Sequence, residues 1–138
     1  ALNGKAENKL IITEPIDFIY DHLLDKLKIN KVTEPITIHS TCSTTKMGLP
    51  DKFEQLAESL SENVNIPLEI GCCGWAGDRG FSHPELNESA LENLKESIPS
   101  NCTKGYSTSR TCEIGLSLHS GINYKSIIYL VDECSSAK

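Results

Sequence analysis

The chain has 138 residues, a length typical of one domain with its own hydrophobic core. Its formal net charge is −6 and its pI is near 5.2. Lys and Arg do not cluster in any window, so nucleic acid is not expected as a partner. No apolar run approaches the roughly 20 residues of a transmembrane helix, and residues 1–9 lack the apolar centre of a signal peptide, so no transmembrane segment is expected.

The first predicted element is an amphipathic helix over residues 14–28, where apolar side chains recur every three or four positions. Thr13 is placed to cap this helix, and Pro15 favours its first turn. We therefore expect residues 1–34 to form a helical segment that leads into one compact domain, residues 35–138.

The middle of the chain predicts two strands, each followed by a helix. A short β-branched strand is expected at 36–39, and a helix with one apolar face begins at Pro50. A second strand is expected at 66–70, running directly into the glycine-rich segment GCCGWAGDRG at 71–80. A third helix is expected from His83 to about Ser97.

The last third of the chain continues the alternation of strands and helices. A weak strand is expected at 105–108 and a helix at 110–120, and residues 124–134 fit either a helix or a last strand. Strands that alternate with helices indicate an α/β fold. We expect a three-layer-like domain in which helices flank a small, mainly parallel sheet.

Four of the six cysteines follow predicted strands, and they are Cys42, Cys72, Cys73 and Cys112. Ligands of parallel sheets gather outside the carboxyl ends of the strands, so these thiols are expected to converge on one edge. Soft thiolate ligands from several loops suit an iron-sulfur cluster. Nearby glycines would let backbone amides approach the anionic sulfur, and the residues expected in this role are Gly71, Gly74, Gly77 and Gly80.

Other chemistries remain open at this point. Disulfides in an oxidising compartment would also use cysteines, and Asn87 and Asn101 lie in glycosylation sequons. Structural zinc and thiol oxidoreductase sites both favour short Cys-x-x-Cys pairs, which this sequence lacks. His39 could donate to a cluster sulfur or have a structural role, and Trp75 is expected as a lid over the site.

Three segments carry a resemblance to a known family: HSTCSTTKMGL (39–49), CCGWAGDRGFSHPEL (72–86) and SRTCEIGL (109–116). They resemble the C-terminal cysteine-rich (CCG) domain of heterodisulfide reductase subunits and of FAD-linked 2-hydroxyacid oxidases of the D-lactate dehydrogenase type. The resemblance implies a cluster held by the four cysteines named above. Ser109 stands where the family has a further cysteine, which favours a four-cysteine 4Fe-4S cluster over a five-thiolate, non-cubane one.

The resemblance also implies a place in a larger oxidoreductase. The chain opens on Ala1 and its only methionine is Met47, so we expect a fragment of a longer chain. In such a flavoprotein an FAD domain oxidises a D-lactate-like 2-hydroxyacid, and ferredoxin-like and cysteine-rich domains pass the electrons to a quinone or cytochrome-type acceptor. This chain would be the relay, with no catalytic residue of its own, in a cytoplasmic enzyme that can sit at the inner face of the membrane. The alternatives are an interaction domain that has lost its cluster and a thiol-redox module of the heterodisulfide reductase type.

Overall fold

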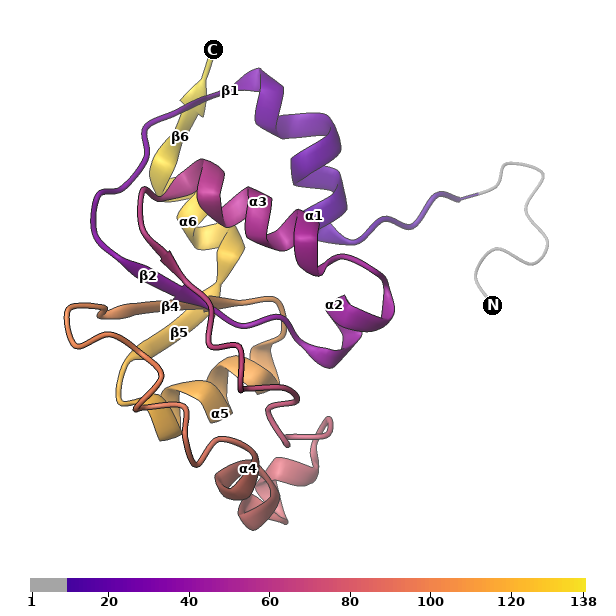
Figure 1. Cartoon of the computed structure of the whole chain (residues 1–138). Helices are drawn as coiled ribbons and strands as arrows, with labels where there is room; N and C mark the ends of the chain where they lie inside the picture. Colours follow the sequence, from indigo (N-terminus) through magenta and orange to yellow (C-terminus); the bar gives the residue numbers. More distant parts are fainter. Residues whose placement is uncertain (1–9) are drawn as a thin grey trace.

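A computed structural model describes residues 10–138, which form three layers (Figure 1). The strands of the middle layer are β2 (Ile36–Ile38), β3 (Val64–Asn65), β4 (Lys104–Ser107) and β5 (Asn123–Ser126). They form one sheet in the order β3-β2-β4-β5, and every neighbouring pair is parallel. The expected α/β class, with a small parallel sheet flanked by helices, is confirmed.

Helices cover both faces of this sheet. The principal helices are α3 (Pro50–Leu60), α4 (Pro84–Ala90), α5 (Arg110–Ser120) and α6 (Ile127–Cys134), and two short ones are α2 (Cys42–Lys46) and η3 (Arg79–Phe81). Figure 1 shows α3 and α6 on one face of the sheet and α5 and α4 on the other. The chain therefore changes face as it passes from β2 and α3 to β4 and α5.

The first helical segment starts at Pro15 and packs on α3. Its cap is Glu14 rather than Thr13, because the Glu14 carboxylate accepts a hydrogen bond from the backbone N–H of Ile16 at 2.6 Å. The segment ends before residue 28, since the chain turns into a strand that pairs antiparallel with the end of the chain. Residues 1–9 of the expected N-terminal segment lie outside the described residues. The elements are α1 (Pro15–Phe18), η1 (Ile19–Leu23), η2 (Leu24–Lys26), β1 (Leu27–Ile29) and β6 (Ser135–Ala137).

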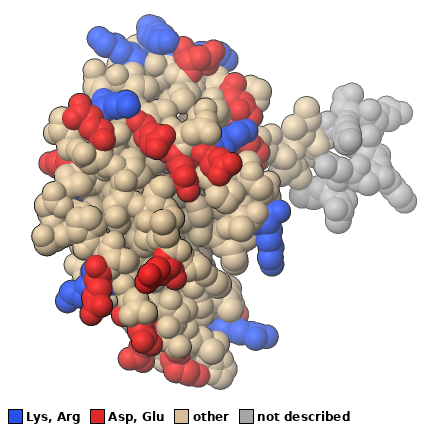
Figure 2. Space-filling model, in the orientation of Figure 1, with Lys and Arg blue, Asp and Glu red and all other residues tan. Residues whose placement is uncertain are grey.

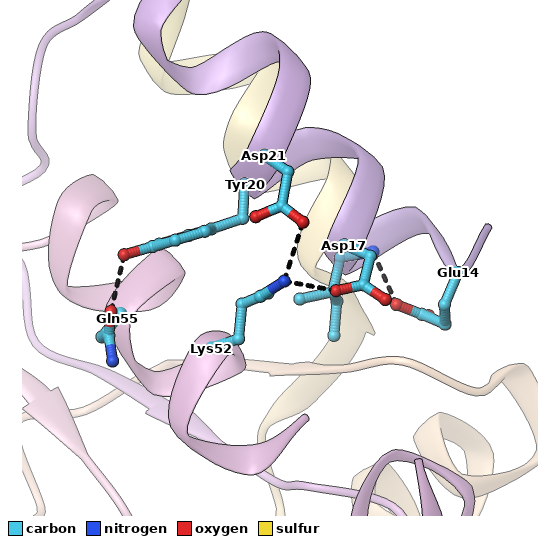
Figure 3. Close-up of polar contacts among 7 residues, drawn as sticks. Glu14, Asp17, Tyr20, Asp21, Lys52 and Gln55 are labelled. Atoms are coloured by element: carbon cyan, nitrogen blue, oxygen red, sulfur yellow. Dashed lines mark hydrogen bonds and ion pairs between the residues drawn. The ribbon is translucent and has the colours of Figure 1, made fainter. Parts of the chain in front are cut away.

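Polar contacts fix this segment against α3 (Figure 3). Lys52 of α3 donates to Asp17 at 2.5 Å and to Asp21 at 2.9 Å, and Tyr20 donates to Gln55 at 2.6 Å. The hydrogen bonds to the two carboxylates raise the pKa of Lys52. Since these side chains are partly or fully exposed, the contacts set the orientation of the segment more than its stability.

Two hydrophobic clusters lie on opposite faces of the sheet. On the α3 face, Ile36 and Ile38 of β2 pack with Phe53 and Ile127, and all four side chains are buried. Burial of each such side chain contributes about 1.5–3 kcal/mol. The cluster on the α5 face belongs to the cysteine region, and its buried members are Cys73, Trp75, Leu91, Leu94, Cys112, Leu116 and Tyr124.

The strand expected at 66–70 is absent. The edge strand β3 ends at Asn65, and residues 66–70 form a loop that closes with a hydrogen bond from Ile70 N to Pro67 O of 3.2 Å. Proline has no backbone N–H to donate to a neighbouring strand, so Pro67 ends the pairing. The apolar composition of this stretch was misleading, because Leu68 is 90% exposed.

Two other segments differ from the sequence-based expectation in length. The helix expected from His83 to Ser97 ends at Ala90, and the chain continues as turns that still bury Leu91 and Leu94. Residues 124–134 contain both of the alternatives, because β5 ends at Ser126 and α6 starts at the next residue. The Ser126 hydroxyl accepts from Ile128 N at 3.4 Å, which makes this serine the boundary between strand and helix.

Charges are distributed without a continuous basic area on the face drawn in Figure 2, and acidic side chains spread over the part that carries α1 and α3. None of the helices within residues 10–138 has both the length and the apolar character needed to cross a bilayer.

We predict that Gly105→Ala destabilises the domain by about 1–3 kcal/mol, the usual cost of overpacking. A Cβ at Gly105 would lie 2.7 Å from ring carbons of the buried Tyr124, and both residues are held in the sheet. Urea unfolding measures the change. The matched control is Gly71→Ala, where a Cβ would meet no atom within 4 Å. Equal stability of the two variants would contradict this account of the Gly105–Tyr124 contact.

Candidate functional site

The candidate site lies where β2 and β4 end side by side at the centre of the sheet. The chain leaves β2 toward α3 on one face and leaves β4 toward α5 on the other, so the two loops diverge beyond the ends of these strands. Ligand sites of open α/β sheets form at this kind of switch point. Cys42 begins α2 directly after β2, and Cys112 lies in the first turn of α5 after β4.

Three threonine hydroxyls join the two loops across this point. Thr41 Oγ1 lies 2.9 Å from Thr44 Oγ1 and 3.1 Å from Thr108 Oγ1. The Oγ1 atoms of Thr44 and Thr108 are 2.8 Å apart. Thr41 Oγ1 also accepts from the backbone N–H of Thr44 and so caps α2. This hydrogen-bonded group fixes the start of α2, and with it Cys42, against the end of β4.

The sulfurs of Cys73 and Cys112 are in direct contact. They lie 2.9 Å apart, and the two residues are only 3% and 7% exposed. The carbonyl of Cys73 accepts a hydrogen bond from the Asn87 side chain, which is itself buried. Asn87 thus holds the cysteine loop from α4, and because it is buried this sequon is not available for glycosylation in the fold.

Asn87 is a site residue that the sequence analysis missed. The available signal was its position, since it is a polar residue three and four positions before Ala90 and Leu91, which face inward. Gly115 on α5 makes room for it, because a Cβ there would lie 2.4 Å from Asn87 Nδ2.

The contact between the two thiols separates their pKa values. The pKa of Cys73 is lowered to about 6, chiefly by the hydrogen bond with Cys112. Burial alone would raise this pKa, and backbone N–H groups, including that of Trp75, lower it further. The pKa of Cys112 is raised, because its thiol keeps the proton shared with Cys73 and because it is buried. The pair therefore loses its first proton more readily than an isolated thiol and its second proton with more difficulty.

The other two cysteines are exposed and face a common cavity. Cys42 and Cys72 line a cavity of about 440 Å³ together with His39 and Lys46. The site thus has a buried half, Cys73 with Cys112, and an open half, Cys42 with Cys72. The remaining cysteines lie elsewhere, as expected: Cys102 donates to the carbonyl of Lys104, and Cys134 donates to the carbonyl of Leu60 in the other core.

His39 ties the end of β2 to the start of the cysteine loop. Its Nε2 lies 2.8 Å from the carbonyl oxygen of Gly71, so Nε2 carries the proton, and its Nδ1 has no hydrogen-bond partner within residues 10–138. Burial lowers the pKa of His39, which is therefore neutral at physiological pH. Its contact in this structure is to the loop backbone, which gives it a positioning role.

The glycines of the loop have separate roles. Gly74 and Gly77 adopt positive φ angles of 71° and 74°, which glycine tolerates best. The N–H of Gly74 donates to Cys72 Sγ at 3.4 Å. Gly80 is required by packing instead, because a Cβ there would lie 2.3 Å from the buried ring of Trp75. Gly77 therefore takes backbone angles that a residue with a Cβ resists, whereas Gly80 does not.

Trp75 is packed in the same buried cluster as Cys73 and Cys112, as a lid would be. Phe81 covers it edge-on, with ring centroids 5.1 Å apart. The indole N–H has no hydrogen-bond partner among the described residues. The aromatic pair keeps water from the buried half of the site and leaves the open half accessible.

The donor chemistry of four thiols suits a metal or cluster, but the cysteines have to rearrange on binding. Within residues 10–138 no three His, Cys, Asp or Glu side chains are close enough to hold one metal ion. Thiolates that share one tetrahedral metal ion, with metal–sulfur bonds of about 2.3 Å, stand about 3.8 Å apart. In a cubane cluster each cysteine binds a different iron, so the thiolates stand farther apart still. The sulfurs of Cys73 and Cys112, at 2.9 Å, are closer than that and would have to separate.

Comparisons of the chain with protein-family models, with curated proteins and with solved structures found no match. Its function is therefore argued from the site.

We predict that one thiolate of the reduced chain titrates near pH 6 and is lost as the pH falls through that value. Cys112→Ala should move this transition up toward the ordinary thiol value of 9.0, because Cys73 loses its hydrogen-bond donor. The ultraviolet absorbance of thiolate measures both curves. Cys102→Ala is the control, since burial raises the pKa of that thiol. A single transition near the ordinary value in the unmodified chain would contradict the coupled pair.

Proposed function

We propose that this chain is an iron-sulfur electron-transfer domain in which Cys42, Cys72, Cys73 and Cys112 hold the cluster. The observation that carries this proposal is the contact between the thiols of Cys73 and Cys112, which come from separate segments, while Cys42 and Cys72 line a cavity that includes the end of β2. Two further cysteines of the same chain take no part in this group. A fold that uses its cysteines only as small hydrophobic residues has no reason to gather four of them at a ligand-binding edge.

The surroundings of the sulfurs support the proposal. Backbone N–H groups of Gly74 and Trp75 are directed at the sulfurs of Cys72 and Cys73, and such donors stabilise negative charge on sulfur. A cluster, when bound, takes up and releases single electrons at a potential set by these hydrogen bonds and by exposure. The chain itself would exclude water from the buried half with Trp75 and present the half with Cys42 to a partner.

The resemblance to CCG domains supports a 2-hydroxyacid oxidoreductase as the parent protein. In this proposal the chain relays electrons from the FAD domain of a D-lactate dehydrogenase-like enzyme to a quinone or cytochrome-type acceptor, in the cytoplasm or at the inner face of the membrane. Ser109, which stands where the family has a cysteine, is close enough to Cys112 to hydrogen-bond its sulfur; this contact opposes, without cancelling, the rise in the pKa of that thiol caused by Cys73 and burial. A serine in this position supports a cluster with four cysteine ligands.

The test is reconstitution of the reduced chain with ferrous iron and sulfide without oxygen. We expect about four iron and four sulfide per chain, the content of one cubane cluster. Serine substitutions at each of the four cysteines should lower the iron content several-fold. The matched controls are Cys102→Ser and Cys134→Ser, which remove buried thiols outside the site and should retain the full iron content.

Circular dichroism checks that each variant is folded before iron is counted. Iron contents that fall equally for control and site variants, or no iron in the unmodified chain, would refute the cluster. Binding of zinc in place of iron, with the same four cysteines, would change the proposal from electron transfer to a structural metal site.

A further inference from the structure

We propose that Cys73 and Cys112 form a reversible disulfide in the metal-free chain, and that this bond controls whether the site can be loaded. The disulfide itself is independent of the proposed function. The effect of the disulfide on cluster uptake rests on the iron-sulfur proposal. Separate experiments test the formation of the disulfide and its effect on uptake.

The sulfurs of Cys73 and Cys112 are already close to bonding distance. The sulfurs are 2.9 Å apart and a disulfide bond is about 2.05 Å long, so the atoms must approach by less than about 1 Å. The sulfur of Cys73 is hydrogen-bonded to that of Cys112, whereas the sulfurs of Cys102 and Cys134 donate to backbone carbonyls. Both thiols are free in this structure.

The neighbouring cysteines are unsuitable partners. A bond between the adjacent residues Cys72 and Cys73 would strain the peptide bond between them. Cys72 and Cys42 are exposed and line the open cavity, whereas Cys73 and Cys112 are buried. The buried pair is also shielded by Trp75 and Leu116, so a large thiol-containing protein cannot reach it, whereas a small oxidant can.

The oxidation needs a hydroperoxide as the co-reactant. The sulfur of one cysteine attacks the peroxide, the O–O bond breaks, and sulfenic acid and one water are formed. The second thiol then attacks the sulfenic sulfur, the S–S bond forms, the S–O bond breaks, and a second water leaves. Two thiols and one hydrogen peroxide thus give one disulfide and two waters, and a dithiol reverses the reaction by exchange.

The disulfide and the metal-bound state exclude each other. Sulfurs joined in a disulfide at about 2.05 Å are no longer thiolates, and they are too close together to bind two different irons of a cluster. Both ligands of the buried half would be lost by one oxidation. An oxidised chain must therefore be reduced before it can take up a cluster.

The first experiment treats the reduced chain with a small excess of hydrogen peroxide and counts thiols. We expect two of the six thiols to disappear. Tryptic cleavage leaves Cys72 and Cys73 in the peptide 53–79 and Cys112 as the only cysteine of the peptide 111–125, and mass spectrometry should find these two joined. Cys72→Ser should keep this link, and Cys73→Ser should abolish it.

Circular dichroism of the variants separates loss of the link from loss of the fold, and Cys102→Ser provides a buried-thiol control that keeps the link. Six remaining thiols, or a peptide 111–125 that is joined only to a cysteine other than Cys73, would overturn the disulfide.

The second experiment compares iron uptake by the peroxide-treated chain before and after addition of dithiothreitol. We expect several-fold less iron in the oxidised chain and recovery after reduction. Equal uptake by the two samples would overturn the control of loading. If the link forms but the reduced chain binds no iron, the disulfide stands, and both the proposed function and the control of loading fail.

Discussion

The parallel pairing of β2 with β4 is the constraint on which the cysteine site depends. Because these central strands run side by side and their helices pass to opposite faces, their loops must separate at the carboxyl edge. Hydrogen bonds among the hydroxyls of Thr41, Thr44 and Thr108 join the two loops. Thr41 also caps α2 and so sets where this helix begins. Cys42 and Cys112 are therefore located by the topology of the sheet before any contact between cysteines is formed.

The parallel sheet could be predicted, because the alternation of strands and helices leaves a strong pattern in the sequence. The expected convergence of all four cysteines stays a prediction, since only Cys73 and Cys112 are in contact in this structure. The helices that begin at Pro50 and Arg110 were also predictable, because their apolar periodicity is clear. The loop at 66–70 was not, since an apolar composition resembles a strand and only the missing N–H of Pro67 ends the pairing.

The division of the site into halves could not be seen in the sequence. Cys72 and Cys73 are neighbours with the same chemistry, yet Cys72 is exposed, whereas Cys73 packs in the buried cluster with Trp75. The hydrogen bond from the Asn87 side chain to the Cys73 carbonyl could not be predicted either, since the partner of a polar side chain on a helix depends on how the helix packs. Sequence reasoning thus located the edge of the sheet and missed the contacts that give each thiol its environment.

The two hydrophobic clusters also have a consequence for the order in which the chain folds during synthesis. The cluster that contains Cys73 and Cys112 is drawn from residues that end at Tyr124 in β5. The cluster on the opposite face is incomplete until Ile127, Leu130 and Val131 of α6 have been made. On the ribosome, the cluster around Cys73 and Cys112 can therefore assemble while the far side of the sheet is still uncovered.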